Sequence, residues 1–155
     1  IPNCFLAITK ESAPDAAETK ESECALAFIL PQGVPIFARY LHPKVRAPVL
    51  KALADFGARD AAYTPAWQTA PGLMLDAKGN PAVLMGTWWK DGRSLVVVSN
   101  TGSTPAKAVV TVPNGALLRA AAVYPQTIPE LSQPGANAAF ELDLPAHSFR
   151  MFRME

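Results

Sequence analysis

The first third of the chain has the hydrophobic pattern of alternating strands and helices. Residues 4–9 and 34–38 are short apolar runs of the kind that buried strands show. Between them, residues 16–30 are rich in helix-forming amino acids, and Pro31-Gln32-Gly33 predicts where that helix ends. The pattern therefore predicts a strand, a helix and a second strand, in this order.

A second helix is predicted over residues 43–56. Four apolar side chains recur there with the spacing of one helical face: Val45, Val49, Leu53 and Phe56. Gly57 is suited to end the helix, because glycine adopts a positive φ without strain. Pro48 lies inside this range, so we expect it to kink the first turn or to mark where the regular helix begins.

The rest of the chain consists of short strand-like runs separated by turn signals. Seven strands are expected, over residues 73–76, 82–89, 94–100, 106–112, 118–124, 138–142 and 148–154. Asp91-Gly92 lies between two apolar runs and favours a tight hairpin, since its turn needs a positive φ at both central residues. Regular short strands with such turns indicate an antiparallel sandwich or barrel.

These elements predict a β-rich α+β fold in two parts. Residues 1–68 form a short α/β segment, and residues 69–155 form an antiparallel β-sandwich. The first part is too short for a complete doubly wound sheet or barrel, because parallel strands need crossover helices. We therefore expect it to be the end of a larger domain or a small cap on the sandwich.

Composition and charge narrow the classes of partner. Of the 155 residues 50% are hydrophobic and 17% are charged, which is enough apolar material for a core. The formal net charge is +1 and basic residues are not clustered, so we expect neither a nucleic-acid nor a membrane partner. The longest apolar run, residues 24–30, is far too short to span a bilayer.

The residue patterns of metal and cofactor sites are missing from the sequence. Cys4 and Cys24 allow one disulfide at most and lack the spacing of a zinc site. His42 and His147 lie far apart, and we interpret them as unrelated. There is no glycine-rich phosphate loop and no Gly-x-Ser-x-Gly motif. We expect no cofactor and no metal, and the catalytic residues remain unknown.

Five segments, taken in chain order, resemble a known architecture. They are residues 30–36 (LPQGVPI), 53–57 (LADFG), 63–67 (YTPAW), 94–102 (SLVVVSNTG) and 144–149 (LPAHSF). The first two look like a last barrel strand and a last barrel helix, and the third is similar to an exit into a sandwich. The order resembles the C-terminal end of a multi-domain glycoside hydrolase, where a (β/α)8 catalytic barrel is followed by an antiparallel β-sandwich.

The resemblance implies an accessory role that covers and stabilises the barrel, in a secreted or periplasmic enzyme. Such enzymes use a pair of carboxyl groups at barrel strand ends. Here we interpret the early acidic residues as the solvent-exposed start of a helix, where the helix dipole stabilises negative charge. They are Glu11, Asp15, Glu18, Glu21 and Glu23. Glu11 is the best single candidate for a site residue, yet the resemblance implies that the catalytic carboxylates lie outside this chain, with the remainder of the catalytic domain as partner.

An accessory role also predicts an apolar face that stays bare when the chain is isolated. We expect that face around four residues: Val34, Ile36, Val49 and Leu53. The alternatives are an independent carbohydrate-binding module, which uses an exposed tryptophan, and a structural interaction domain.

Aromatic side chains are the candidate contacts for a carbohydrate, because sugar C–H groups pack on flat rings while polar neighbours bind hydroxyls. Trp88 and Trp89 are adjacent on a predicted strand, so they point to opposite faces. The carbohydrate-binding candidates are Trp88, Trp89, Trp67, Tyr63, Asp91 and Arg93. The competing interpretation is that one of the paired tryptophans fills the sandwich and the other packs at the junction of the two parts.

Overall fold

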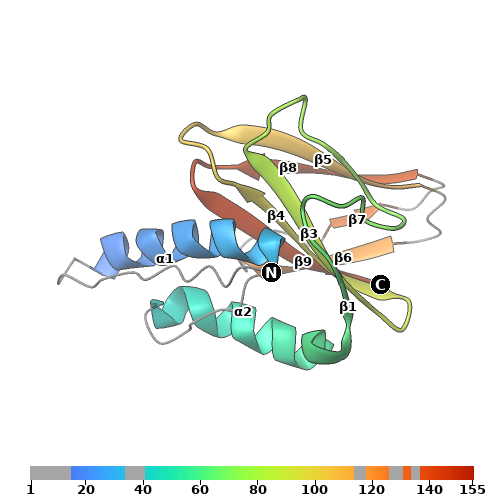
Figure 1. Ribbon diagram of the computed structural model, residues 1–155, viewed down its shortest axis with the longest axis horizontal. Helices are drawn as coiled ribbons and strands as arrows, with labels where there is room; N and C mark the ends of the chain where they lie inside the picture. The colour runs from blue at the N-terminus through green and yellow to red at the C-terminus, as the bar shows by residue number, and fades with distance from the viewer. Residues whose placement is uncertain (1–14, 34–40, 114–117, 126–130, 134–136) are drawn as a thin grey trace.

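A computed structural model describes residues 15–33, 41–113, 118–125, 131–133 and 137–155. These residues form two helices and two antiparallel sheets, one of six strands and one of three (Figure 1). The predicted β-rich α+β class is therefore confirmed. The boundary expected near residue 68 stays a prediction.

Both predicted helices are present. Helix α1 (Asp15–Ile29) continues into a 3₁₀ turn (Leu30–Gln32) and ends at Gly33, whose φ is 66°. Helix α2 (Pro43–Phe56) ends at Gly57, whose φ is 72°. It begins at Pro43, so Pro48 does not mark its start. The strands expected at 4–9 and 34–38 lie outside the described residues.

The strands agree closely with the predicted runs. They are β1 (Ala62–Thr64), β2 (Met74–Asp76), β3 (Val83–Lys90), β4 (Arg93–Asn100), β5 (Ala106–Pro113), β6 (Leu118–Tyr124), β7 (Leu131–Gln133), β8 (Asn137–Leu144) and β9 (Ser148–Met154). The larger sheet has the order β1-β3-β4-β9-β6-β7, and the smaller has the order β2-β5-β8. The predicted hairpin joins β3 to β4, with a φ of 50° at Asp91 and 74° at Gly92.

The fold has three layers, with the six-stranded sheet in the middle. Figure 1 shows the three-stranded sheet on one side of it and both helices on the other. Strand β4 serves both cores because its side chains alternate. Val96 and Val98 enter the core between the sheets, whereas Leu95 and Val97 enter the core beneath the helices.

The bare apolar face expected around Val49 and Leu53 is not observed. Val49 is fully buried and Leu53 is partly buried, because this side of α2 packs against the six-stranded sheet. Val34 and Ile36 lie outside the described residues.

Candidate functional site

The two adjacent tryptophans point to opposite faces of β3, as predicted. Trp88 is only 9% exposed and lies in the core beneath the helices, with its ring centroid 4.7 Å from that of Tyr63. Trp89 packs against the core between the sheets, and its Nε1 has no hydrogen-bond partner among the described residues. Both rings are therefore used in packing, Trp88 as a buried residue and Trp89 as a partly buried one.

Tyr63 joins the end of α1 to the six-stranded sheet. Its hydroxyl donates to the carbonyl oxygen of Leu30 at 2.7 Å, and its burial raises the pKa of the phenol well above the ordinary value. The backbones are close at this point. A Cβ on Gly86 would lie 2.7 Å from the Tyr63 hydroxyl and 2.8 Å from Cα of Pro31. The position of Tyr63 is that of a packing residue.

The other three candidates lie apart from this core. Asp91 is exposed in the β3–β4 turn. Arg93 is partly buried, and its guanidinium carbon lies 6.0 Å from the ring centroid of Phe56, within the range of a cation–π contact. Trp67 is 67% exposed on the loop between β1 and β2. The structure thus brings Tyr63 and Trp88 into contact but does not gather the six candidates at one site, and their role in binding a carbohydrate stays a prediction.

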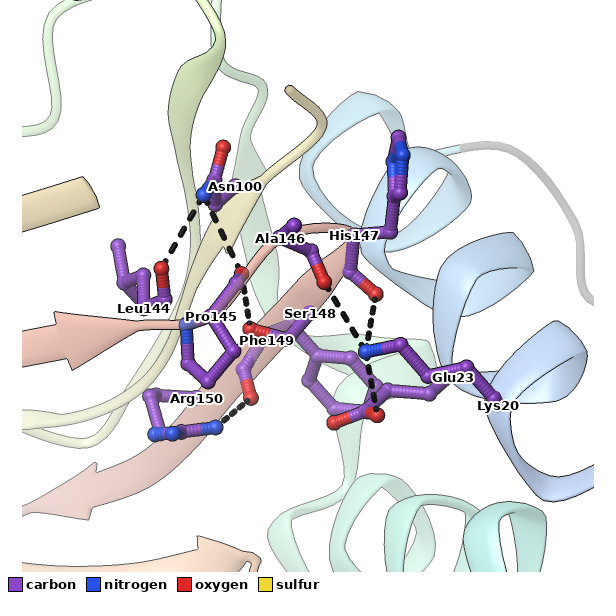
Figure 2. Close-up of polar contacts among 10 residues, drawn as sticks. All are labelled: Lys20, Glu23, Asn100, Leu144, Pro145, Ala146, His147, Ser148, Phe149 and Arg150. Atoms are coloured by element: carbon purple, nitrogen blue, oxygen red, sulfur yellow. Dashed lines mark hydrogen bonds and ion pairs between the residues drawn. The ribbon is translucent and has the colours of Figure 1, made fainter. Parts of the chain in front are cut away.

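Sequence reasoning missed a polar network between α1 and the β8–β9 turn (Figure 2). The ammonium group of Lys20 donates to the carbonyl oxygen of Ala146 at 3.0 Å and pairs with the Glu23 carboxylate at 3.3 Å. Ser148 closes the turn by donating to the carbonyl oxygen of Pro145 at 2.7 Å. These contacts fix the helix to the turn. The bond from Lys20 to Ala146 could not be read from the sequence, because the two residues are 126 positions apart.

A partly buried charged cluster lies beside this network. The pKa of Tyr124 is raised to about 12, chiefly by burial and in addition by the Glu23 charge, while the Arg150 charge opposes the rise. Burial also lowers the pKa of Arg150. The Tyr124 ring stacks on Phe149 with centroids 4.6 Å apart. We interpret the cluster as charge compensation at a packed junction.

Depressions on the described surface include one over the three-stranded sheet and one beside α2. One, of about 260 Å³, lies over the three-stranded sheet and is lined by Asp76, Lys78, Lys107, Ala108, Val109, Glu141, Leu142 and Asp143. The other, of about 170 Å³, lies between α2 and the six-stranded sheet and is lined by Pro48, Lys51, Ala52, Asp55, Leu95, Ala122, Val123 and Arg153. Neither lining contains an aromatic ring, so neither offers the surface expected for a sugar.

The described residues contain neither a cluster of metal ligands nor a membrane-spanning helix. Among the described residues, no group of three His, Cys, Asp or Glu side chains is placed to hold a metal ion. No described helix is long and apolar enough to cross a bilayer. Glu11 and Cys4 lie outside the described residues, and Cys24 is exposed on α1.

Comparisons with known proteins find similarity in solved structures alone. No protein-family model and no curated protein matches the chain. A noncanonic maltogenic alpha-amylase from Thermotoga neapolitana is similar with a TM-score of 0.51 at 12% identity, covering 92% of this chain and 39% of the amylase. This likeness shows a shared fold, and its extent means that the fold includes the helices as well as the sheets.

Two xylanases give weaker matches. A GH30 endoxylanase from Clostridium papyrosolvens matches with a TM-score of 0.38 at 21% identity, over 70% of this chain and 27% of its own. A glycoside hydrolase family 30 xylanase from Clostridium acetobutylicum matches with a TM-score of 0.36 at 18% identity, and the match covers 56% of this chain and 24% of the xylanase. These solved neighbours are all glycoside hydrolases, and the chain spans well under half of each.

Proposed function

We propose that this chain is the C-terminal accessory portion of a glycoside hydrolase, where it supports a catalytic barrel. The fold shared with the amylase supports this role, because it includes both the helices and the sandwich while spanning 39% of that enzyme. On this proposal the catalytic carboxylates lie outside the chain, and the whole enzyme is secreted or periplasmic.

The observation that carries the proposal is that α2 is apolar on two opposite faces. Its inner face is buried against the sheet through Val45, Val49 and Phe56. Its other face bears a second apolar stripe at helical spacing, and these residues are exposed: Pro43, Ala47, Leu50 and Ala54. Lys44, Lys51 and Asp55 lie between the two stripes, so the helix is apolar on two sides only, and the exposed stripe is a surface on which a further layer can pack.

Helix α1 has one exposed large apolar side chain on its outer side, beside the charged Lys20 and Glu21. Its Leu26 is fully buried beneath the sheet, whereas Phe28 is 52% exposed. The six-stranded sheet supplies one layer for both helices, and barrel strands would supply the second. We therefore place the barrel against the outer sides of α1 and α2.

The alternatives have less support. The independent carbohydrate-binding module was expected to use Trp88 or Trp89, and both rings lie in cores. A structural interaction domain would also explain an outer apolar stripe, and it differs from the accessory role in having no hydrolase joined to it.

The size of the native gene product tests the proposal directly. An antibody raised against the 155-residue chain should detect a product well above 16.5 kDa in the source organism. That product should hydrolyse a polysaccharide. A native product of 16.5 kDa, or a larger one without hydrolase activity, would refute the accessory role.

A charge placed on the outer stripe tests the position of the barrel. Leu50→Glu in the full-length product should lower its Tm, because the carboxylate would be buried against the barrel. Met74→Glu is the matched control, since Met74 is 61% exposed on the small sheet. In the 155-residue chain alone, both changes should alter the free energy of unfolding by no more than about 0.5 kcal/mol. Equal effects of both variants in the full-length product would contradict this placement.

A further inference from the structure

We infer that Trp67 is a saccharide-stacking residue, which holds the apolar face of a pyranose ring on the loop between β1 and β2. Its 67% exposure exceeds that of the other exposed large apolar side chains in the described part of the chain. An indole ring presents a broad flat surface and one N–H donor, a combination suited to a ligand that is apolar on one side and polar at its edge. The inference does not require a catalytic barrel.

The loop holds Trp67 in a fixed position. Pro65 is buried on one side of Trp67, and Ala70 and Leu73 enter the core between the sheets on the other. The backbone N–H of Ala66 also donates to the carbonyl oxygen of Pro31 at 2.8 Å. A ring presented on an anchored turn loses little conformational entropy when a ligand binds, so even a small contact area can produce measurable affinity.

The chemistry around Trp67 matches an uncharged, hydroxyl-rich ligand. Residues 61–75 contain no Asp, Glu, Lys or Arg, which removes the basis for recognising an ion. Gln68 and Thr69 are exposed and follow Trp67 in the chain, so the same loop offers amide and hydroxyl groups. A protein hot spot is instead surrounded by contacts that exclude water. The polar neighbours therefore favour a saccharide over a protein surface.

The lower exposure of the other two tryptophans makes Trp67 the most accessible of the three. Trp88 is buried and Trp89 is partly buried, so quenching of fluorescence by acrylamide should report mainly on Trp67. We would titrate the 155-residue chain separately with maltoheptaose, cellohexaose and xylohexaose. Retention on starch, cellulose and xylan would be measured in parallel. At least one of the three oligosaccharides should protect Trp67 from acrylamide, and the chain should be retained on the corresponding polysaccharide.

Three variants identify the contact. Trp67→Ala should reduce retention about tenfold, Trp67→Tyr should keep most of it, and the exposed apolar control Met74→Ala should keep all of it. Circular dichroism in the near ultraviolet verifies that each variant folds. The inference is overturned if no oligosaccharide protects Trp67 and the chain is retained on none of the three polysaccharides. It is also overturned if the Trp67→Ala variant is retained as well as the wild type.

A protein contact at Trp67 gives a different result. If Trp67 is already shielded from acrylamide in the full-length product, and Trp67→Ala lowers the Tm of that product, the ring binds protein and the inference is wrong. The mass and activity of the native product test the accessory role separately, so the two ideas can fail independently.

Discussion

At the scale of single residues, Asn100 connects more of the molecule than its short side chain suggests. It is fully buried, and its Nδ2 donates to three carbonyl oxygens, those of Thr104, Leu144 and Pro145, at 2.7, 3.1 and 3.2 Å. Its Oδ1 accepts from the backbone N–H of Gly102 at 2.9 Å. One amide therefore ties the end of β4 to the connection between β8 and β9, in part shown in Figure 2.

Asn100→Ala should lower the free energy of unfolding by about 2–4 kcal/mol, because it removes the buried donor to the carbonyl oxygens of Thr104 and Leu144 and the acceptor of the Gly102 N–H. Urea unfolding measures the change. Asn80→Ala is the matched control, since the partly buried Asn80 makes a comparable local bond to the N–H of Ala82 and should cost about 1 kcal/mol or less. If both variants lose the same free energy of unfolding, the Asn100 hydrogen bonds contribute no more than the single local bond of Asn80.

Tyrosine ionisation should weaken the fold in alkali. Burial raises the pKa of Tyr124 from 10.0 to about 12, so its contribution to stability is complete below pH 10 and is lost as the pH rises through 12. Tyr63 shifts in the same direction for the same reason. Urea unfolding between pH 9 and 12 should give a falling free energy, and Tyr124→Phe should flatten that slope. An unchanged slope in Tyr124→Phe would contradict the raised pKa.

At the scale of elements, the 3₁₀ turn after α1 and strand β3 approach each other closely at Gly86. Gly86→Ala should destabilise the protein by about 1–3 kcal/mol, because the new Cβ would meet the Pro31 backbone at 2.8 Å. Gly79→Ala provides a comparison in open space, where only its φ of 76° opposes the change. Thermal unfolding of both variants measures the difference. If Gly86→Ala unfolds like the wild type, the turn can move away from β3.

Most of the elements that sequence reasoning found have a long local signal, and the three-residue strand β2 is the exception. Helix α2 and strands β3, β4 and β9 each carry seven or more residues of consistent pattern and were predicted within one residue. Strands β1 and β7 have three residues each and were missed. Their pairing, such as Tyr63 opposite Trp88, is a property of the assembled sheet rather than of the segment.

The candidate site was predictable only in part, for a related reason. The alternation along β3 correctly placed Trp88 and Trp89 on opposite faces. It could not show that both faces are covered, because the helices and the second sheet come from distant parts of the chain. The exposure of Trp67 likewise depends on the neighbours that hold its loop, and a lone tryptophan in a sequence carries no sign of it.

At the scale of the whole molecule, the six-stranded sheet belongs to two cores at once. Any loss of the helical layer would expose Leu95, Val97 and Met151, and any loss of the small sheet would expose the other side of the same strands. We therefore expect the layers to unfold in one cooperative transition.

Two tryptophans can report on the two cores separately. In a Trp67→Phe background, Trp88→Phe leaves Trp89 between the sheets, and Trp89→Phe leaves Trp88 beneath the helices. In each variant, the urea midpoint from fluorescence should equal the midpoint from far-ultraviolet circular dichroism. If the midpoint of Trp88 fluorescence precedes that of circular dichroism, the helical layer unfolds as a separate unit, as the boundary near residue 68 would suggest.

The order of strands in the larger sheet also bears on how the protein is made. Strand β9 follows the other described strands along the chain, yet it lies inside the sheet between β4 and β6. During synthesis, β3 and β4 can pair as a hairpin, but β6 has no partner linking it to them until β9 has been translated. Nascent chains must therefore expose the edges of β4 and β6 until then, and this interval is when a chaperone would bind or misassembly would begin.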